Sequence, residues 1–572
     1  MSSSSTLSVE RHLRVPMRDG ILLATDVYRP SGPGSFPTLL ARTPYDKNAE
    51  GPSPLTIRAA SAGYAVITQD VRGRYSSEGA FRPFHSERDD GYDTLDWIAS
   101  QPWSNGNVGM FGGSYVGVTQ WQAAISGHSA LRAIVPSVTA GNYHNGWTYQ
   151  GGAFAHQFNV AWSLSSLGPA DAQRIQGKLS ADYFELVDRR DHMMNDFKRL
   201  PLAGRPLFST HVPYFEEWLQ HPTYDSFWQA VDVAPHYSAL SVPSLNTGGW
   251  YDIFSRGTTE NFVGMRTSGP TAAADATHLL MGPWNHSGVS RGNPIGDKDF
   301  GTLSTGKHID IDGIHLDWFD RHLRGEGGDE MARVRLFVMG GPGWREYEDW
   351  PIPGTDNQRW HLHSAGRANS AAGDGSLSVE PPTAEPPDTY DYDPRDPVPT
   401  VGGQLCCNMV HALGGPQDQR EVEQRDDILV YTSTELGEPL DVIGPVEMRL
   451  VAASSAVDTD FTAKLVDVAP CGYATILSDG IIRARFRNSM SEEALLTPDE
   501  PTEYRIEMGP TAHRFNVGHR VRLEISSSNF PRFDRNPNTG ELPGLSDRHE
   551  IARQTVFHSS EYPSFLILPV LR

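Results

Sequence analysis

The stretch Met110-Phe-Gly-Gly-Ser-Tyr-Val-Gly117 decides the fold of this chain. It follows the turn-rich Asn105-Gly-Asn107 and precedes a run of helical character that starts at Val118. A short apolar strand, a serine flanked by glycines and then a helix is the arrangement of a nucleophile elbow. Because this turn is sharp, we expect Gly112 and Gly117 to provide room for it and Ser114 to project from the top of a sheet.

The motif departs from the common pattern, which places a glycine two residues after the serine. Here that position is Val116, and the glycine follows at 117. Gly-x-Ser sequences also occur by chance, so the prediction depends on what surrounds the motif.

The surrounding sequence predicts a mostly parallel sheet. An early hairpin is indicated by two apolar runs that flank Asp19-Gly20, a strong hairpin turn signal. Strand-like runs then alternate with helical stretches such as 89–100 and 118–126, which is typical of a parallel sheet covered on both faces. The predicted strands of this sheet are 37–42, 64–70, 109–111, 133–136, 243–247 and 278–282.

Two further regions differ in character from this alternation. Residues 145–240 are rich in aromatic residues with helical periodicity, and they predict an inserted helical cap. Beyond Gly354, short alternating stretches predict an antiparallel sandwich or jelly roll. The predicted architecture is therefore an α/β-hydrolase core (1–144 and 241–354), a helical cap (145–240) and a C-terminal jelly-roll β domain (355–572).

Composition narrows the classes of function. The 572 residues carry a formal net charge of −22, which disfavours nucleic acid or an anionic membrane as a partner. The N-terminus lacks the basic and apolar regions of a signal peptide. Three cysteines, Cys406, Cys407 and Cys471, do not form a disulfide framework, and we interpret them as small buried hydrophobic residues. These features together predict a reducing, cytoplasmic location.

A serine hydroxyl needs a base, and the base needs a carboxylate that orients it. Asp252 directly follows the predicted strand 243–247, and His286 directly follows the predicted strand at 278. Both side chains should therefore rise from the sheet edge that carries Ser114, in the chain order Ser, Asp, His of α/β-hydrolases. The alternative is that Asp252 is an acidic residue of a surface loop and that His286 is a loop histidine held by hydrogen bonds.

Acyl transfer also requires hydrogen-bond donors for the oxyanion. The backbone N–H of Tyr115, directly after the nucleophile, is one by elbow geometry. The phenolic O–H of Tyr45, in the loop after an early strand, is a candidate for the second, and a packed loop aromatic is the alternative for this residue. No set of His, Cys and carboxylates shows zinc spacing, so we expect neither a metal nor a cofactor.

Four separated motifs resemble the bacterial cocaine esterase family, within the wider group of X-prolyl dipeptidyl peptidases and α-amino acid ester hydrolases. They are Pro44-Tyr-Asp-Lys47, the elbow at 112–117, Gly249-Trp-Tyr-Asp252 and Gly282-Pro-Trp-Asn-His286. The resemblance implies the three-part architecture above. It also implies Ser114 as nucleophile, His286 as base, Asp252 as its orienting carboxylate, and Tyr45 with the Tyr115 N–H as oxyanion donors.

The resemblance carries over to the substrate pocket only in part. In that family an aromatic acyl pocket is formed by cap tryptophans, a phenylalanine after the acid of the triad and a Leu-Phe pair of the jelly roll. Trp147, Trp162 and Phe254 match the first three positions, whereas Cys406-Cys407 replaces the Leu-Phe pair. We therefore expect a pocket that is wider and softer on this side, which leaves cocaine itself in doubt as a substrate.

The leading hypothesis is a serine carboxylesterase that acts on small esters with aromatic or hydrophobic acyl groups. An amidase, an X-prolyl dipeptidyl aminopeptidase or an α-amino acid ester hydrolase is the enzymatic alternative, in which Asp297 and Asp299 would hold a substrate ammonium. An inert hydrolase-fold binding protein is the non-enzymatic alternative. An apolar edge of the jelly roll is compatible with a homodimer.

Overall fold

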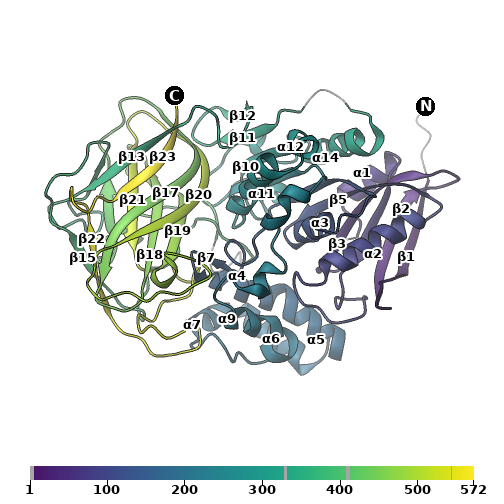
Figure 1. The fold of residues 1–572 in the computed structure, drawn as a ribbon, viewed down its shortest axis with the longest axis horizontal. Helices are drawn as coiled ribbons and strands as arrows, with labels where there is room; N and C mark the ends of the chain where they lie inside the picture. Colours follow the sequence, from purple (N-terminus) through teal and green to yellow (C-terminus); the bar gives the residue numbers. More distant parts are fainter. Residues whose placement is uncertain (1–5, 50, 328–330, 408–412, 543) are drawn as a thin grey trace.

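The computed structural model describes residues 6–49, 51–327, 331–407, 413–542 and 544–572. Within them, a ten-stranded sheet runs in the order β1-β2-β4-β3-β5-β6-β9-β10-β11-β12, and strands β4 to β11 of this order are parallel (Figure 1). The strands are β1 (Leu7–Pro16), β2 (Leu22–Pro30), β3 (Phe36–Thr43), β4 (Ala65–Asp70), β5 (Ser104–Gly113), β6 (Leu131–Ser137), β9 (Leu245–Tyr251), β10 (His278–Asn285), β11 (Val334–Val338) and β12 (Gly343–Tyr347).

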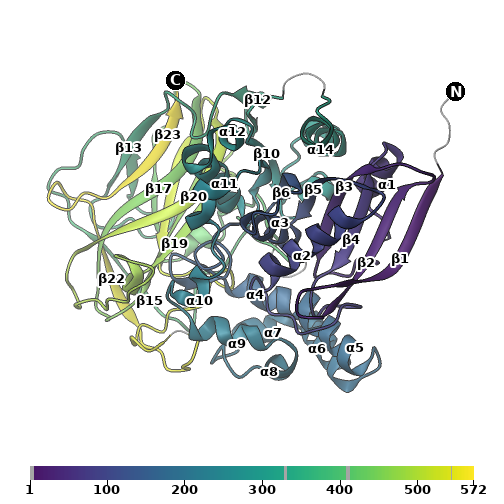
Figure 2. The ribbon, with the colours of Figure 1, turned by 45° about the vertical axis from the view of Figure 1, so that its right-hand side comes forward.

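Helices cover both faces of this sheet, as its apolar strands require (Figure 2). Neighbouring residues of one strand, such as Met110 and Phe111, belong to two different hydrophobic clusters. The first cluster includes residues of α2 and α3, and the second includes residues of α1 and α14. The helices are α1 (Pro54–Ser61), α2 (Glu87–Ser100), α3 (Tyr115–Ile125), α11 (Ser255–Ser268), α12 (Thr271–Asp275), α13 (Gly288–Arg291) and α14 (Ile311–Phe319), with short segments η3 (Thr302–Ser304) and η4 (Asp320–Arg324).

The structure confirms the predicted hairpin and the six predicted strands, with one correction. The segment Asn105-Gly-Asn107 is not a turn before the central strand but part of β5, which begins at Ser104. Its glycine and asparagines are weak strand formers, so their local preference favoured a turn. Residues 105–107 have no partner in either ladder, which pair β5 with β3 at Ser104 and with β3 and β6 from Val108 on, so they form an irregular stretch inside the strand. Gly106 has a positive φ of 82° there, and the Asn107 N–H donates to Asn105 Oδ1 at 3.0 Å.

The cap lies between β6 and β9 and is largely helical, below the sheet in Figure 1. Its core is aromatic, with Trp162 stacked on Trp218 at 6.0 Å between ring centroids. Its elements are β7 (Tyr149–Gln150), β8 (Ala153–Phe154), α4 (His156–Trp162), η1 (Ser163–Leu167), α5 (Gly168–Gln176), α6 (Ala181–Asp191), α7 (Met193–Lys198), α8 (Phe208–His211), α9 (Pro213–Gln220), α10 (Ser226–Gln229) and η2 (Ala234–Ala239).

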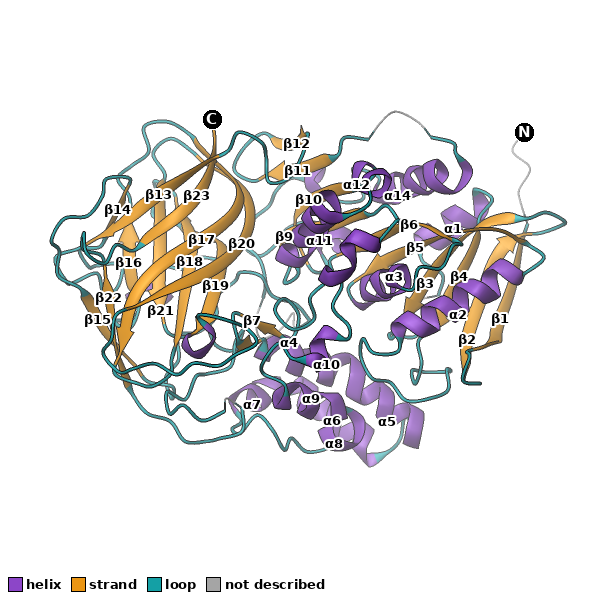
Figure 3. Cartoon of the chain, viewed as in Figure 1, coloured by secondary structure: helices purple, strands orange, loops and turns teal. Residues whose placement is uncertain are grey.

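The C-terminal part is a mostly antiparallel β domain of strands and loops (Figure 3). Alternate strand residues point into a hydrophobic core of its own, as the period-2 pattern predicts. The strands are β13 (Asp356–His363), β14 (Ser376–Ser378), β15 (Asp388–Tyr392), β16 (Leu429–Thr432), β17 (Leu440–Ser454), β18 (Asp460–Val468), β19 (Ala474–Arg483), β20 (Thr502–Phe515), β21 (Arg520–Ser526), β22 (Ala552–Phe557) and β23 (Phe565–Leu571), with η5 (Val422–Gln424) and η6 (Ala484–Phe486).

Buried hydrogen bonds join the β domain to the other two parts. Gln404 Nε2 donates to Ser255 Oγ at 2.8 Å, at the start of α11. Gln157 Nε2 of the cap donates to the carbonyl of Cys406 at 2.8 Å. Since unpaired buried polar groups are costly, these bonds fix the segment 404–407 of the β domain against the α/β core and the cap.

No helix in the described ranges combines the length and the apolar character that crossing a bilayer requires.

Candidate active site

Ser114 lies in the sharp turn between β5 and α3. Its backbone has φ 60° and ψ −127°, a conformation that a non-glycine residue adopts only when the surrounding structure holds it there. A Cβ at Gly112 would lie 2.4 Å from Val116 Cγ1, and one at Gly117 would lie 2.6 Å from Thr139 Cγ2. The two glycines therefore allow the close approach that the elbow needs, as predicted.

Asp252 and His286 emerge side by side from neighbouring strands. Tyr251 of β9 pairs with Asn285 of β10, so the residue that follows each leaves the same edge of the sheet. His286 Nδ1 lies 2.6 Å from Asp252 Oδ2. The fully buried carboxylate also accepts the Phe254 N–H through Oδ1, at 2.9 Å. A carboxylate at Nδ1 fixes the neutral imidazole with Nε2 as the acceptor.

A bond between Ser114 and His286 is the remaining contact of the predicted triad. Among the hydrogen bonds of the described residues, none of regular geometry joins Ser114 Oγ to His286 Nε2. In serine hydrolases without substrate this bond is often long and tightens in the Michaelis complex.

Tyr45 follows β3 and presents its hydroxyl to Ser114 and Trp162. Tyr45 is half-buried as a whole, but its hydroxyl lies inside the protein. This burial raises the pKa of Tyr45 to about 12. Ser114 and Trp162 oppose this rise as polar neighbours, although neither contact has regular hydrogen-bond geometry. The hydroxyl therefore keeps its proton at neutral pH and can donate it beside the nucleophile.

Sequence reasoning missed the residue that holds the Tyr45 loop. The buried Arg74 donates to the carbonyls of Pro44 and Leu167, both at 3.1 Å. It thereby ties the loop after β3 to the cap. No motif marks this arginine, because its partners are backbone carbonyls that are distant in the sequence.

Tyr115 is the first residue of α3, and a helix offers no internal acceptor for the N–H of that position. Its side chain points away into the core, where the hydroxyl accepts the Phe84 N–H at 2.8 Å and donates to Glu87 at 3.1 Å. Within the described part of the chain the Tyr115 N–H has no acceptor in its own helix, and its role as an oxyanion donor stays a prediction.

Trp147, Trp162 and Phe254, predicted to bind substrate, form one aromatic cluster next to the histidine. Phe254 stacks on Trp147 with 4.2 Å between ring centroids, and its edge meets the His286 ring at 5.5 Å. Trp162 contacts Trp147 at 5.8 Å. The three side chains are at most 2% exposed. Flat apolar rings therefore wall the site on the side of the cap.

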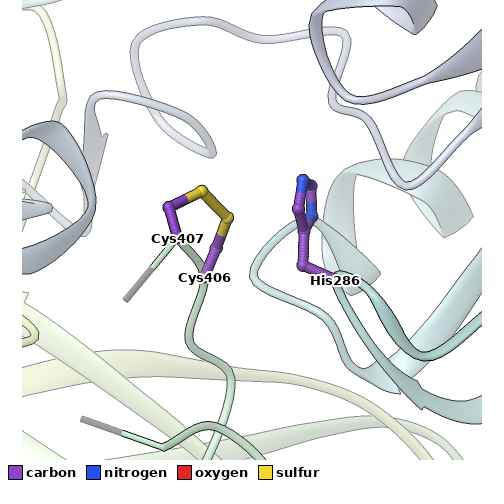
Figure 4. Close-up of side chains that lie close together, drawn as sticks. All are labelled: His286, Cys406 and Cys407. Carbon is purple, nitrogen blue, oxygen red and sulfur yellow. A yellow bond between two sulfur atoms is a disulfide. The ribbon is translucent and has the colours of Figure 1, made fainter. Parts of the chain in front are cut away.

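Cys406 and Cys407 are joined by a disulfide, which corrects the prediction of three free, buried cysteines (Figure 4). The free cysteine is Cys471, and it is exposed rather than buried. Cys406 is buried and Cys407 is half-buried with a positive φ of 68°. The disulfide removes the cysteines as an argument for the predicted reducing location, which was also based on the N-terminal sequence.

The fold also brings the cysteine pair to the histidine. Potential ligand atoms of Cys406, Cys407 and His286 all lie within 4.8 Å of one another. Figure 4 shows the disulfide and the imidazole facing each other from different segments of the chain. The sequence showed no metal-ligand spacing because 120 residues separate the first cysteine from the histidine.

Asp297 and Asp299 are exposed and have partners of their own. Tyr473 donates to Asp297 at 2.8 Å, and the Gly301 N–H donates to Asp299 at 2.7 Å. Neither carboxylate is held unpaired for a substrate ammonium.

A serine at a nucleophile elbow, beside an aspartate–histidine pair on neighbouring strand ends, defines the class of serine hydrolases with an α/β-hydrolase domain. Residues 19–288 match the family described as X-Pro dipeptidyl-peptidase (S15 family), and residues 327–567 match the X-Pro dipeptidyl-peptidase C-terminal non-catalytic domain. The chain belongs to this family of serine hydrolases.

Three relatives cover the whole length of the chain. The cocaine esterase of Rhodococcus sp. (strain MB1 Bresler) is 40% identical over 99% of both chains. The structure of an aminopeptidase from a marine sediment Thaumarchaeota archaeon has a TM-score of 0.84 at 28% identity, over 100% of this chain and 97% of that one. An α-amino acid ester hydrolase structure has a TM-score of 0.84 at 27% identity, over 100% and 98%.

Proposed function

We propose that this protein is a serine carboxylesterase that hydrolyses small esters with aromatic or hydrophobic acyl groups through an acyl-enzyme. The observation that carries the proposal is the Asp252–His286 pair at 2.6 Å, placed at the sheet edge that holds Ser114 and the Tyr45 hydroxyl. Similarity to the Rhodococcus cocaine esterase supports an ester as substrate.

In this mechanism His286 Nε2 accepts the proton of Ser114 as Oγ attacks the ester carbonyl. The Asp252 carboxylate stabilises the resulting imidazolium. The Tyr45 O–H and the Tyr115 N–H donate to the tetrahedral oxyanion. The ester C–O bond then breaks as His286 protonates the leaving alkoxide oxygen, and the acyl group stays on Ser114 Oγ. A water that gives its proton to His286 attacks this acyl carbonyl, and the C–Oγ bond breaks as His286 returns the proton to Ser114, which releases the acid.

The side chains around the site favour an ester substrate that carries no ammonium group. Substrates with a free amino group need a carboxylate to pair with it. Among the described residues at the site, Asp252 is engaged with His286, and Glu87 lies 3.0 Å from the buried Arg42. The aromatic cluster and the cysteine pair instead favour an apolar acyl group.

The direct test is a substrate panel of acetyl, butyryl and benzoyl p-nitrophenyl esters, α-amino acid esters and matching amides. We expect the highest kcat/KM for an uncharged aryl or alkyl ester. A kcat/KM that is higher by about tenfold or more for amino-acid esters or aminoacyl-prolyl amides would assign the alternative activity. No turnover of any member would favour the inert binding protein.

The pH dependence should show one rising limb. The base must be neutral to accept the serine proton, so kcat/KM should increase with pH on the acidic side. Because burial raises the pKa of Tyr45 to about 12, its donor proton is kept and activity should stay level to about pH 10. Ester hydrolysis in constant-ionic-strength buffers measures this profile. A profile without a rising limb, or a fall that disappears in Tyr45→Phe, would contradict it.

Cys407→Phe should shift the acyl preference. A phenyl ring on this side would narrow a wall now formed by sulfur, so kcat/KM for benzoyl esters should fall relative to acetyl esters, by roughly tenfold for this size of steric change. The ratio of the two kcat/KM values measures the effect. Cys407→Ala, which breaks the same disulfide without adding a ring, is the matched control. An unchanged ratio in Cys407→Phe would remove this residue from the acyl site.

A homodimer formed through an apolar edge of the β domain remains a prediction, and the mass of the purified protein by light scattering tests it.

A further inference from the structure

Three side chains that can ligate a soft metal ion meet at His286, the proposed catalytic base. The potential ligand atoms of Cys406, Cys407 and His286 lie within 4.8 Å of one another. They come from two different domains, as Figure 4 shows, and the segment that carries the cysteines is fixed by the hydrogen bonds of Gln157 and Gln404. The juxtaposition is therefore built into the fold.

We propose that reduction of the Cys406–Cys407 disulfide creates a site for one thiophilic divalent ion, such as Zn²⁺ or Cd²⁺, and that the bound ion switches the hydrolase off. Its ligands are the two thiolates and His286 Nε2. The oxidised protein has no thiolates to offer, so the disulfide protects the site. The loss of activity rests on the proposed function of His286 as base, whereas metal binding does not.

The donor set suits such an ion. Zinc prefers thiolate sulfur and imidazole nitrogen in tetrahedral geometry, with neighbouring ligand atoms roughly 3.5–3.8 Å apart for Zn–S of about 2.3 Å. Separation of the two sulfurs after reduction brings the three ligand atoms into this range. His286 Nδ1 is already bonded to Asp252, which is the carboxylate–histidine–metal arrangement that orients a ligating imidazole. A water would take the fourth position.

The reductant is a dithiol. One of its thiolates attacks the sulfur of Cys407, since Cys406 is the more buried of the two. An S–S bond forms to the reductant, the protein disulfide breaks and Cys406 leaves as a thiolate. The second thiol of the reductant then closes its own disulfide and releases Cys407. Binding of the ion displaces the two protons that remain on the thiols, so one dithiol and one M²⁺ yield the loaded site, an oxidised dithiol and two H⁺.

The binding experiment uses the full chain in two forms, as purified with the disulfide intact and after treatment with dithiothreitol that is then removed without oxygen. Cd²⁺ is titrated into each form, and the thiolate-to-cadmium charge-transfer absorption is recorded. We expect one equivalent of Cd²⁺ to produce the band in the reduced protein only. Cys407→Ser should weaken binding by at least roughly tenfold, since even loss of an outer partner costs about that much. Cys471→Ser is the matched control and should bind like the parent.

Activity is measured on the same samples with Zn²⁺. The rate of each variant with Zn²⁺ is divided by its own rate in EDTA, so a change in the basal rate does not affect the comparison. We expect Zn²⁺ to lower the rate of ester hydrolysis by at least about tenfold in the reduced parent and in reduced Cys471→Ser. EDTA should restore this rate, and the oxidised protein should lose little activity. Reduced Cys406→Ser, checked for fold by circular dichroism, provides a second test of the ligand set.

The outcomes separate the two proposals. A missing cadmium band in the reduced parent, or a band that Cys406→Ser and Cys407→Ser both leave unchanged, overturns the metal site. Equal Zn²⁺ inhibition of the oxidised protein overturns the role of the disulfide. A normal band without any loss of activity overturns the proposed switch, because an ion held by His286 Nε2 would block the base.

Discussion

Ser114→Ala should lower kcat for ester hydrolysis by on the order of a millionfold, because triad residues act as a unit and loss of the nucleophile removes the covalent route. The fold should be unaffected. The residue is half-buried, and its Oγ makes no hydrogen bond of regular geometry with the described residues. Alanine also keeps the Cβ that the turn already accommodates. Single-turnover hydrolysis of a p-nitrophenyl ester, with circular dichroism beside it, measures both effects.

Ser126→Ala is a matched control at the far end of the same helix, where Oγ donates only to the carbonyl of Ala123. Its kcat should stay within about twofold of the parent, as expected of a surface substitution away from the site. If folded Ser114→Ala retained more than a few per cent of activity, in order-of-magnitude terms, Ser114 would not be the nucleophile.

Tyr45→Phe should reduce kcat by roughly a hundred- to a thousandfold, about 2.7–4 kcal/mol of transition-state stabilisation. The substitution removes one oxygen, and burial keeps that oxygen protonated, so the lost group is a neutral donor. Its hydrogen bond should strengthen as charge develops on the substrate oxygen, so KM should change little. Steady-state kinetics with an activated ester separates kcat from KM.

Tyr64→Phe is the control of the same chemistry. The Tyr64 hydroxyl donates to Asp320 at 2.6 Å, and the residue precedes β4, at the opposite edge of the sheet from the site. This variant should keep its kcat. Activity of Tyr45→Phe within a fewfold of the parent would make Tyr45 a packing residue. A raised KM with unchanged kcat would make it a substrate-binding residue instead.

The sequence allowed prediction of the sheet and of the elbow because these depend on short-range chemistry. Asp19-Gly20 specifies a hairpin whatever surrounds it, and Gly112 and Gly117 are required where the chain turns sharply. The pairing of Asp252 with His286 could also be predicted, since each directly follows a strand of one parallel sheet. The functional roles of these residues remain predictions that the experiments above test.

Other features depend on long-range packing that no local pattern records. Asn105-Gly-Asn107 favours a turn by local preference, yet it lies within β5 because Ser104 before it and Val108 after it both pair with β3. The Cys406–Cys407 disulfide was missed because counting cysteines assumes pairing between distant residues, whereas this bond joins neighbours. Arg74 acts through backbone carbonyls that only the folded chain brings to it.

The segment that carries Cys406 and Cys407 has a consequence for divergence within the family. The domain whose family name is non-catalytic places two sulfurs beside His286, while the residues of the proposed triad lie in the α/β core. Chemistry and one wall of the site are thus encoded in separate parts of the gene. Mutation can remodel the wall, or make it sensitive to oxidants and metals, without altering the machinery that cleaves the bond, so selectivity can drift on a conserved reaction.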